Sequence, residues 1–367
     1  MEKKLGFGLM RLPVTDVNDP GSIDVPLVCN MVDTFLERGF TYFDTAWMYC
    51  GSKSENAVKE VLTKRHPRDS FTVTSKLPSG SLTTLESRDE IFNTQLEKTG
   101  LEYFDYYLLH AVSGSNIDKF RQFQCFDWIK EKKAAGLVRN IGFSYHDGPE
   151  LLDQILTEHP EFDLVQLQIN YLDWENPKVQ SRACYEVAVK HGKPVIIMEP
   201  VKGGALANVP QSVEQMFLRR DPKMSMASWA VRFAAGLPGV KMVLSGMSNM
   251  EQVVDNTSFM ADMKPLTEEE REMVLFAGEV IGQNMAIACT GCSYCVDQCP
   301  RQIAIPQYFA LYNKACNDEN VEADYRALTW EYGKASDCIV CGACEKICPQ
   351  HLPIRTYLRS VAEKFEV

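Results

Sequence analysis

The chain has 367 residues, of which 45% are hydrophobic and 24% charged, an ordinary composition for a soluble globular protein with room for two domains. Its net charge of −11 argues against nucleic acid as a partner, because phosphate binding needs clustered lysines and arginines. The N-terminal segment MEKKLGFGLMRLPV lacks the apolar stretch of a secretory signal, and no apolar run approaches the ~20 residues that span a bilayer. We therefore expect a cytoplasmic protein that binds neither nucleic acid nor membranes.

Short apolar runs alternate with amphipathic stretches along the first 265 residues. The apolar runs predict strands near 5–10, 40–44, 71–76, 106–110, 139–144, 164–169, 195–199 and 242–245. A predicted helix follows each strand, at 26–38, 54–64, 87–99, 119–135, 149–158, 177–191, 224–235 and 250–260. Eight strand–helix units predict an α/β fold, a (β/α)8 TIM barrel. A doubly wound sheet is the alternative, but no GxGxxG motif follows an early strand.

Four polar side chains are expected at the carboxyl ends of these strands, where barrels carry their active sites. Asp44, Lys76 and His110 end three successive strands, and Tyr49 follows five residues after Asp44. Tyrosine has a pKa near ~10 and is a poor acid unless a neighbouring cation favours its ionised form. Lys76 can supply that cation, Asp44 can keep Lys76 charged, and His110 can hydrogen-bond a carbonyl oxygen. Each residue alone can be structural, but together they predict a proton-transfer site.

The segment 39–49, GFTYFDTAWMY, resembles the signature of the aldo-keto reductases. The segments TSKL (74–77), LLH (108–110), GFS (142–144), QLQIN (166–170) and EPVKGG (199–204) are similar to later strands and loops of that family. The resemblance covers about residues 1–265. It implies that Tyr49 is the general acid, that Lys76 and Asp44 tune it, and that His110 orients a substrate carbonyl. It also implies that the hydride comes from NADPH or NADH.

The same resemblance implies a dinucleotide site. Ser144 and Gln166 would hold the carboxamide, and the glycine-containing loop after the seventh strand would carry the pyrophosphate. The start of the last barrel helix would take the adenosine end. The expected cofactor-binding residues are Ser144, Gln166, Pro200, Val201, Lys202, Gly203, Gly246, Gln252, Asp255 and Asn256.

Three positions depart from the family pattern. Gly246 and Gln252 stand where NADPH-specific relatives carry a lysine and an arginine for the 2′-phosphate. An uncharged pocket lacks the charge-assisted contacts that favour a phosphate, so NADH also becomes a candidate cofactor. Glu199 stands where the family usually stacks an aromatic ring on the nicotinamide.

Nine of the thirteen cysteines fall between residues 289 and 348, and eight of them form two Cx2Cx2Cx3CP runs. Three closely spaced thiolates of each run can bind one [4Fe–4S] cluster, whose fourth ligand comes from the other run. The expected ligands are Cys289, Cys292, Cys295 and Cys348 for cluster 1, and Cys338, Cys341, Cys344 and Cys299 for cluster 2. The runs resemble bacterial dicluster ferredoxins; a structural zinc site would leave the third cysteine of each run without a role. The ninth, Cys316, is expected to be a buried thiol.

Residues 266–367 are therefore expected to form a linker helix, beginning at 266–270, and a small, mainly α-helical ferredoxin-type domain with helices near 307–315 and 322–332. We expect this domain to pack beside the barrel mouth. The whole chain is similar to aldo-keto reductases that carry a ferredoxin domain. It is expected to be an oxidoreductase that reduces a carbonyl or related unsaturated small molecule.

Hydride carries two electrons and a cluster passes one, so three roles for the clusters stay open. The clusters are structural, or a flavin splits the electron pair, although no flavin motif is present, or the substrate accepts single electrons. In the last two cases a ferredoxin or flavodoxin is a candidate electron partner. The alternative function is an electron-transfer or redox-sensing protein whose barrel has lost its chemistry.

Overall fold

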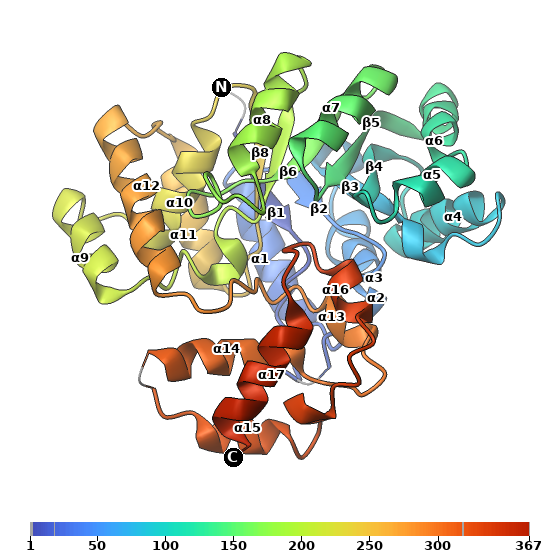
Figure 1. Cartoon of the computed structure of the whole chain (residues 1–367). Coiled ribbons are helices and arrows are strands. Elements are labelled where there is room, and N and C mark those ends of the chain that lie inside the picture. Colours follow the sequence, from blue (N-terminus) through green and yellow to red (C-terminus); the bar gives the residue numbers. More distant parts are fainter. Residues whose placement is uncertain (1–2, 18, 318, 367) are drawn as a thin grey trace.

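Eight parallel strands form a closed barrel in sequence order (Figure 1). The computed structural model describes residues 3–17, 19–317 and 319–366. The strands are β1 (Leu5–Gly8), β2 (Tyr42–Asp44), β3 (Thr72–Pro78), β4 (Phe104–Val112), β5 (Val138–Tyr145), β6 (Leu164–Gln168), β7 (Val195–Met198) and β8 (Val240–Ser245). Their inward side chains pack into a separate apolar cluster inside the barrel, made of Tyr42, Tyr106, Leu108, Leu164, Ile196, Met242 and Leu244. The predicted barrel is confirmed.

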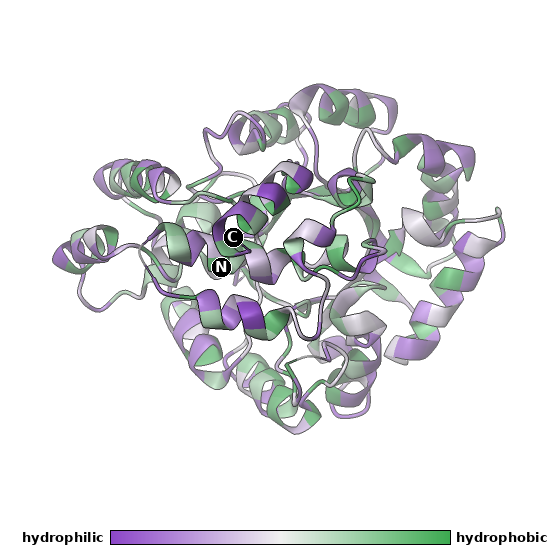
Figure 2. Cartoon of the chain, turned by 60° about the horizontal axis from the view of Figure 1, so that its bottom comes forward, coloured by the Kyte–Doolittle hydropathy of each residue, from purple (hydrophilic) through white to green (hydrophobic). Residues whose placement is uncertain are grey.

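Helices surround the strands and turn their hydrophobic residues inward (Figure 2). They are α1 (Val25–Glu37), α2 (Tyr49–Ser52), α3 (Ser54–Val58), α4 (Ser87–Thr99), α5 (Ile117–Gln122), α6 (Cys125–Ala134), α7 (Pro149–Glu158), α8 (Ser181–Lys190), α9 (Gln211–Arg220), α10 (Met226–Ala235) and α11 (Met250–Ala261). Short turns of other helix types are η1 (Lys59–Thr63), η2 (Arg68–Ser70), η3 (Ser79–Ser81) and η4 (Lys202–Gly204).

The helix expected at 54–64 consists of α3 followed by η1, and two other helices differ more from the prediction. The single helix expected at 119–135 is divided into α5 and α6, because Gln124 between them adopts a left-handed backbone with φ of 51°. Helix α9 was not predicted; it lies in the long connection between β7 and α10. Its sequence gives a weak apolar pattern, with Val213 and Phe217 as its buried residues.

Helix α12 (Glu268–Gln283) begins where the sequence placed a capped start. The Thr267 hydroxyl and the Glu270 carboxylate form a reciprocal capping box there. Val274, Ala277 and Ile281 of this helix belong to the barrel core. The boundary predicted at residue 265 therefore precedes a helix that packs with the barrel, and the second hydrophobic core starts at Ile287.

The C-terminal region is mainly helical and has its own core. Its helices are α13 (Tyr294–Asp297), α14 (Ile305–Cys316), α15 (Glu322–Leu328), η5 (Ala335–Asp337), α16 (Ala343–Ile347) and α17 (Ile354–Phe365). Tyr308, Phe309, Leu358 and Val361 are fully or nearly fully buried between them. In Figure 1 these helices, drawn in orange and red, lie together below the barrel. Within the described ranges, no helix is long and apolar enough to cross a membrane.

Candidate active site and cluster sites

The four residues of the expected proton-transfer site lie together at one end of the barrel. Asp44 ends β2, Lys76 lies in β3, His110 in β4, and Tyr49 begins α2. The Lys76 Nζ lies 2.6 Å from Asp44 Oδ1, 2.9 Å from the Thr45 carbonyl oxygen and 3.2 Å from the Tyr49 hydroxyl. These three contacts use the three protons of the ammonium group. The Tyr49 and His110 rings meet edge to face, with centroids 5.9 Å apart.

Burial sets the protonation of this site. It raises the pKa of the Tyr49 hydroxyl well above its usual value, and the Asp44 carboxylate adds to the rise. This direction is opposite to the expected tuning, because desolvation of the phenolate dominates. Burial also lowers the pKa of His110 well below its usual value, and Lys76 contributes. The site therefore holds a protonated phenol beside a neutral imidazole at neutral pH.

A cavity of about 260 Å³ opens at this end of the barrel and is lined by Asp44, Tyr49 and His110. Of the residues expected to bind a dinucleotide, all except Lys202 line the same cavity. The Gln166 Oε1 atom is buried and has no hydrogen-bond partner. The Ser144 Oγ atom accepts a hydrogen bond from the Ala111 backbone N–H at 2.7 Å. An unpartnered acceptor inside the cavity suits the N–H group of a carboxamide, so the residues fit a nicotinamide.

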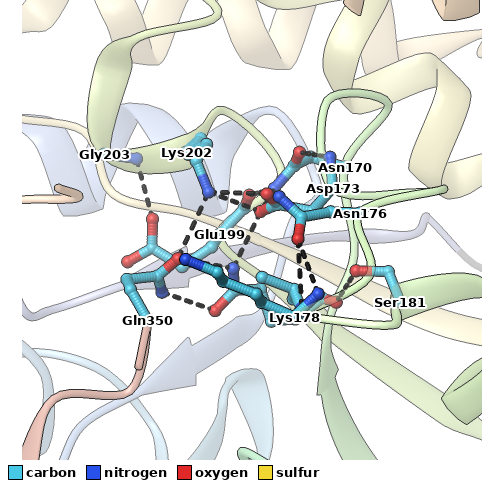
Figure 3. A network of polar contacts seen from close by, with 11 residues as sticks. Asn170, Asp173, Asn176, Lys178, Ser181, Glu199, Lys202, Gly203 and Gln350 are labelled. Atoms are coloured by element: carbon cyan, nitrogen blue, oxygen red, sulfur yellow. Dashed lines mark hydrogen bonds and ion pairs between the residues drawn. The ribbon is translucent and has the colours of Figure 1, made fainter. Parts of the chain in front are cut away.

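The Lys202 side chain is turned away from the cavity. Its Nζ lies 2.7 Å from both carboxylate oxygens of Asp173, and both side chains are buried (Figure 3). Lys202 also donates to Gln350 Oε1, 3.2 Å away in the C-terminal region. Asn170 Nδ2 donates to the same carboxylate at 2.9 Å. The ammonium group of Lys202 is thus engaged in a buried network between the barrel and the C-terminal region.

The residues expected at the adenosine end are bonded to their own neighbours. Gln252 Oε1 accepts from the Ser248 backbone N–H at 2.7 Å, which ties the start of α11 to the loop before it. Asp255 accepts from Ser225 and Asn256 donates to Ser245, each at 2.7 Å.

Arg11 lies where the sequence indicated an uncharged pocket. A Cβ atom built on Gly246 would lie 3.5 Å from the Arg11 side chain. Arg11 is the only lysine or arginine among the residues that line the cavity in the described chain. Its guanidinium lies 3.8 Å from the Glu199 carboxylate and donates to the Thr290 carbonyl oxygen at 2.6 Å. Its place three residues after β1 is the signal that could have identified it.

The C-terminal region packs on the carboxyl ends of the barrel strands, as expected. Gln168 at the end of β6 and Gln350 exchange two hydrogen bonds. His351 contacts the carbonyl oxygen of His146 at 3.1 Å. A Cβ atom on Gly203 would lie 2.2 Å from the Thr290 carbonyl oxygen, so the two backbones are in close contact.

Two further residues of this site were not expected from the sequence. Tyr294 lies between Cys292 and Cys295, lines the barrel cavity, and its ring meets the His110 ring edge to face with centroids 6.3 Å apart. His146 follows β5, lines the same cavity, and has a buried Nδ1 atom without a partner. The sequence did not indicate a role for Tyr294 in the barrel cavity, because the cysteine pattern alone explains the segment in which it lies.

The eight patterned cysteines line two separate cavities. One contains Cys289, Cys292, Cys295 and Cys348, and the other contains Cys299, Cys338, Cys341 and Cys344. In the described residues, no group of three or more His, Cys, Asp or Glu side chains is placed to hold a single metal ion. Two sets of four thiols in apolar cavities fit the donor set of two [4Fe–4S] clusters. Cys292 lines both the first cavity and the barrel cavity.

Two cysteines outside the cluster pattern differ in their exposure to solvent. Cys316, expected to be buried, is exposed at the end of α14 and does not belong to the small core. Cys50, which follows Tyr49, is buried and its thiol donates to the Leu9 carbonyl oxygen at 3.4 Å.

Both halves of the chain are similar to known protein families. Residues 4–274 match the aldo/keto reductase family, and residues 288–353 match the 4Fe-4S dicluster domain. An aldo-keto reductase of Mycolicibacterium vanbaalenii is 26% identical over 60% of this chain and 73% of its own length. The NAD/NADP-dependent indole-3-acetaldehyde reductase of Schizosaccharomyces pombe is 23% identical over 68% of this chain and 85% of its own.

Solved structures share the barrel. The holo form of an aldo-keto reductase from Bacillus halodurans superposes with a TM-score of 0.60 at 22% identity, covering 75% of this chain and 91% of that one. An aldo-keto reductase from Klebsiella pneumoniae in complex with NADPH gives a TM-score of 0.58 at 17% identity, covering 75% and 94%. The family match over residues 4–274 and the second match that follows it show that this chain belongs to the aldo/keto reductase family and carries a C-terminal 4Fe-4S dicluster domain.

Proposed function

We propose that the protein reduces a carbonyl or related unsaturated group of a small molecule in the barrel cavity, with Tyr49 as the general acid. The observation that carries the proposal is the Lys76 ammonium group, which contacts Asp44, Thr45 and Tyr49 at the cavity wall. A bound NADPH or NADH would supply the hydride that adds to the carbonyl carbon. The Tyr49 proton then completes the alcohol, and Lys76 stabilises the phenolate that is left.

The other residues of the site would hold the reactants. The neutral imidazole of His110 would donate a hydrogen bond to the substrate carbonyl oxygen. Gln166 Oε1, which is buried without a partner, would accept from the nicotinamide carboxamide, and Ser144 would contact the same group. The named activity of the Schizosaccharomyces relative and the NADPH of the Klebsiella structure support a nicotinamide-dependent carbonyl reduction.

We further propose that cluster 1 is an electron relay for this cavity when the bound molecule accepts one electron at a time, a route separate from hydride transfer, which needs no relay. Cys292 lines both cavities, so cluster 1 would lie next to a bound molecule. Cluster 2 would lie farther out, because none of its four cysteines lines the barrel cavity in the described chain. A small ferredoxin or flavodoxin is the partner class that exchanges single electrons with such clusters. Nothing in the site specifies a flavin.

The test uses purified, cluster-containing protein and the model aldehyde 4-nitrobenzaldehyde, with NADPH and with NADH. Tyr49→Phe should lower kcat by roughly 100-fold or more, as expected when a general acid is removed. Tyr103→Phe, which removes a barrel hydroxyl that contacts the exposed Arg139, should leave kcat unchanged. Equal turnover by Tyr49→Phe and wild type would remove Tyr49 from the mechanism. A wild-type protein that reduces no carbonyl but whose clusters exchange electrons with a ferredoxin would favour the electron-transfer alternative.

A further inference from the structure

We infer that the surface of the dicluster domain above the cluster 2 cavity docks a small acidic electron-carrier protein of the ferredoxin class. This surface, called here the cluster 2 face, consists of Ile339 and Val340 in the second cysteine run and of Arg301 and Gln302 at the end of the first. All four residues are exposed, and Ile339 and Arg301 line the cluster 2 cavity itself. The inference deepens the proposed electron relay and rests on it.

The cluster 2 face is the counterpart of the surface that docks on the barrel. Each residue of the first cysteine run has a counterpart in the second, because the two runs have the same spacing. The barrel contacts residues 290–291 in the first run and residues 350–351 at the end of the second. Their counterparts are residues 339–340 and 301–302. The repeat therefore builds two equivalent surfaces on the domain, and the barrel covers one of them.

The same backbone geometry occurs at both surfaces. Gly291 and Val340 are counterparts, with φ of 65° and 59°. Arg11 of the barrel donates to the Gly291 carbonyl oxygen at 3.4 Å, and Arg355 of α17 donates to the Val340 carbonyl oxygen at 3.5 Å. The two surfaces thus differ mainly in their side chains: a glycine lies against the barrel, and a valine lies at the free surface.

Val340 is an apolar residue that gains little from the fold at this position. Its left-handed backbone suits glycine and strains a β-branched residue. The side chain does not offset this strain by burial, because Val340 is 56% exposed and the adjacent Ile339 is 58% exposed. Two neighbouring exposed apolar side chains at the rim of a cluster cavity are explained by a partner that covers them.

The charges at the cluster 2 cavity indicate the kind of partner. Arg301 and Arg355 line this cavity, and no carboxylate lines it in the described chain. The cluster 1 cavity, which faces the barrel, is lined by no charged side chain of the described residues. Arg355 forms an ion pair with Glu345 at 2.7 Å, whereas Arg301 lies at 4.0 Å from Asp337. The guanidinium of Arg301 is therefore the less neutralised of the two.

Lys346 adds a further cation beside the same cavity. It is exposed, and its backbone N–H bonds to the carbonyl oxygen of Gly342, which lines the cavity. The whole chain carries a net charge of −11, so an acidic protein is repelled by the molecule as a whole and attracted to a local group of cations. An acidic ferredoxin fits this pattern. It gives up one electron and is oxidised, the dicluster domain gains that electron, and no bond forms or breaks.

The first experiment measures the binding of an oxidised, acidic plant-type [2Fe–2S] ferredoxin to cluster-containing protein by isothermal titration calorimetry at low salt. Val340→Gly removes an apolar side chain where the backbone suits glycine, and Val340 does not line the cluster 2 cavity. We expect its dissociation constant to rise about fivefold. Val189→Ser removes an exposed valine of α8 and should leave binding unchanged. No binding by wild type, or a constant for Val340→Gly within twofold of wild type, overturns the inference.

An EPR-monitored titration separates lost docking from an altered cluster. Because Val340→Gly leaves the cavity lining intact, the reduction potential of cluster 2 should be the same in this variant and in wild type. A shifted potential combined with unchanged binding would mean that Val340 acts on the cluster and not on a partner.

The second experiment tests the charge. Stopped-flow spectroscopy follows the reduction of the clusters by the reduced ferredoxin under anaerobic conditions. Lys346→Glu should lower the second-order rate constant about tenfold at low salt, and the difference from wild type should shrink at high salt. Lys223→Glu, which changes an exposed lysine between α9 and α10, should match wild type. Equal rate constants for Lys346→Glu and wild type contradict the electrostatic part of the inference.

A second copy of this chain is the other candidate occupant of the cluster 2 face. Sedimentation velocity should show the same species for wild type and Val340→Gly; a wild-type dimer that Val340→Gly converts to a monomer would overturn the inference. Failure of the proposed function gives a different result. If the ferredoxin binds and reduces the clusters but the protein reduces no aldehyde, the reductase proposal fails and the docking site stands.

Discussion

Gln168 and Gln350, 182 positions apart in the chain, exchange two amide hydrogen bonds of 3.0 Å and 2.7 Å. Both side chains are buried. Gln168 ends the sixth barrel strand, and Gln350 follows the expected cluster ligand Cys348 by two residues. The pair therefore joins the carboxyl end of β6 to the cluster-binding segment.

Replacing Gln350 should weaken the docking of the C-terminal region. Gln350→Ala leaves Gln168 Oε1 buried without a donor, which costs about 1–3 kcal/mol. We expect faster cleavage by thermolysin, which cuts before apolar residues such as Met285 and Ile287, in the stretch 284–290 than in wild type, measured by limited proteolysis under anaerobic conditions. Gln307→Ala removes an exposed glutamine of α14 and is the matched control. Equal cleavage rates of Gln350→Ala and wild type would show that the amide pair does not hold the domains together.

Removing only one member of the buried ion pair between Asp173 and Lys202 should strongly lower the stability of the folded protein. Asp173→Ala leaves the Lys202 ammonium buried without its carboxylate, at about 3–5 kcal/mol of stability. Glu175→Ala breaks the exposed pair with Arg182 and should cost less than about 1 kcal/mol. Thermal unfolding of the three proteins checks this order. In Asp173→Ala/Lys202→Met the uncompensated charge is gone, so this protein should be more stable than Asp173→Ala; the reverse order would contradict the argument.

Gly203 should resist substitution more than another glycine with the same backbone. Gly203 and Gly192 have φ of 63° and 64°, and a side chain at either position costs about 1–2 kcal/mol of backbone strain. At Gly203 the new Cβ would also lie 2.2 Å from the Thr290 carbonyl oxygen, whereas at Gly192 it would meet no atom within 4 Å. We expect Gly203→Ala to lower both the thermal midpoint and the iron content well below those of Gly192→Ala. Similar losses in both proteins would mean that the Thr290 loop moves away freely.

His146 should make the protein less stable in mild acid. Burial lowers its pKa to about 4, with the His351 and Lys76 charges contributing, whereas an unfolded histidine titrates near ~6.5. Between these values the unfolded chain binds a proton that the folded chain excludes, so stability falls as the pH falls from about 6.5 to about 4, by at most about 3 kcal/mol. The midpoint of thermal unfolding should therefore drop less between pH 7 and pH 5 in His146→Gln than in wild type. Parallel pH profiles would show that His146 is protonated in the folded protein.

The crossed set of cluster ligands can be tested with two cysteines from different runs. If Cys289 and Cys348 bind the same cluster, Cys289→Ala, Cys348→Ala and the double variant should all damage one cluster and leave the EPR signal of the other intact. If each run binds its own cluster, the double variant damages both. Anaerobic EPR and iron analysis distinguish the two results.

The sequence by itself determined the barrel, the cysteine pattern and the four residues at the strand ends. Strand–helix alternation and strand-end chemistry are local properties, so the order of the strands and the meeting of Asp44, Lys76 and His110 follow from them once the barrel closes. The start of α12 could also be predicted from local sequence, because the capping box of Thr267 and Glu270 spans only four residues.

Only the tertiary structure decided how the two halves meet. Tyr294, Gln350 and Arg11 have no local pattern that indicates an active site, because each acts on residues that are more than a hundred positions away. Burial depends on the whole fold and not on one segment, and it reversed the expected pKa shift of Tyr49. The distant carboxylate of Asp173 binds Lys202, which was expected to contact the cofactor. The reductase cavity and the first cluster cavity thus become neighbours through Cys292, a relationship that depends on the packing of one domain against the other.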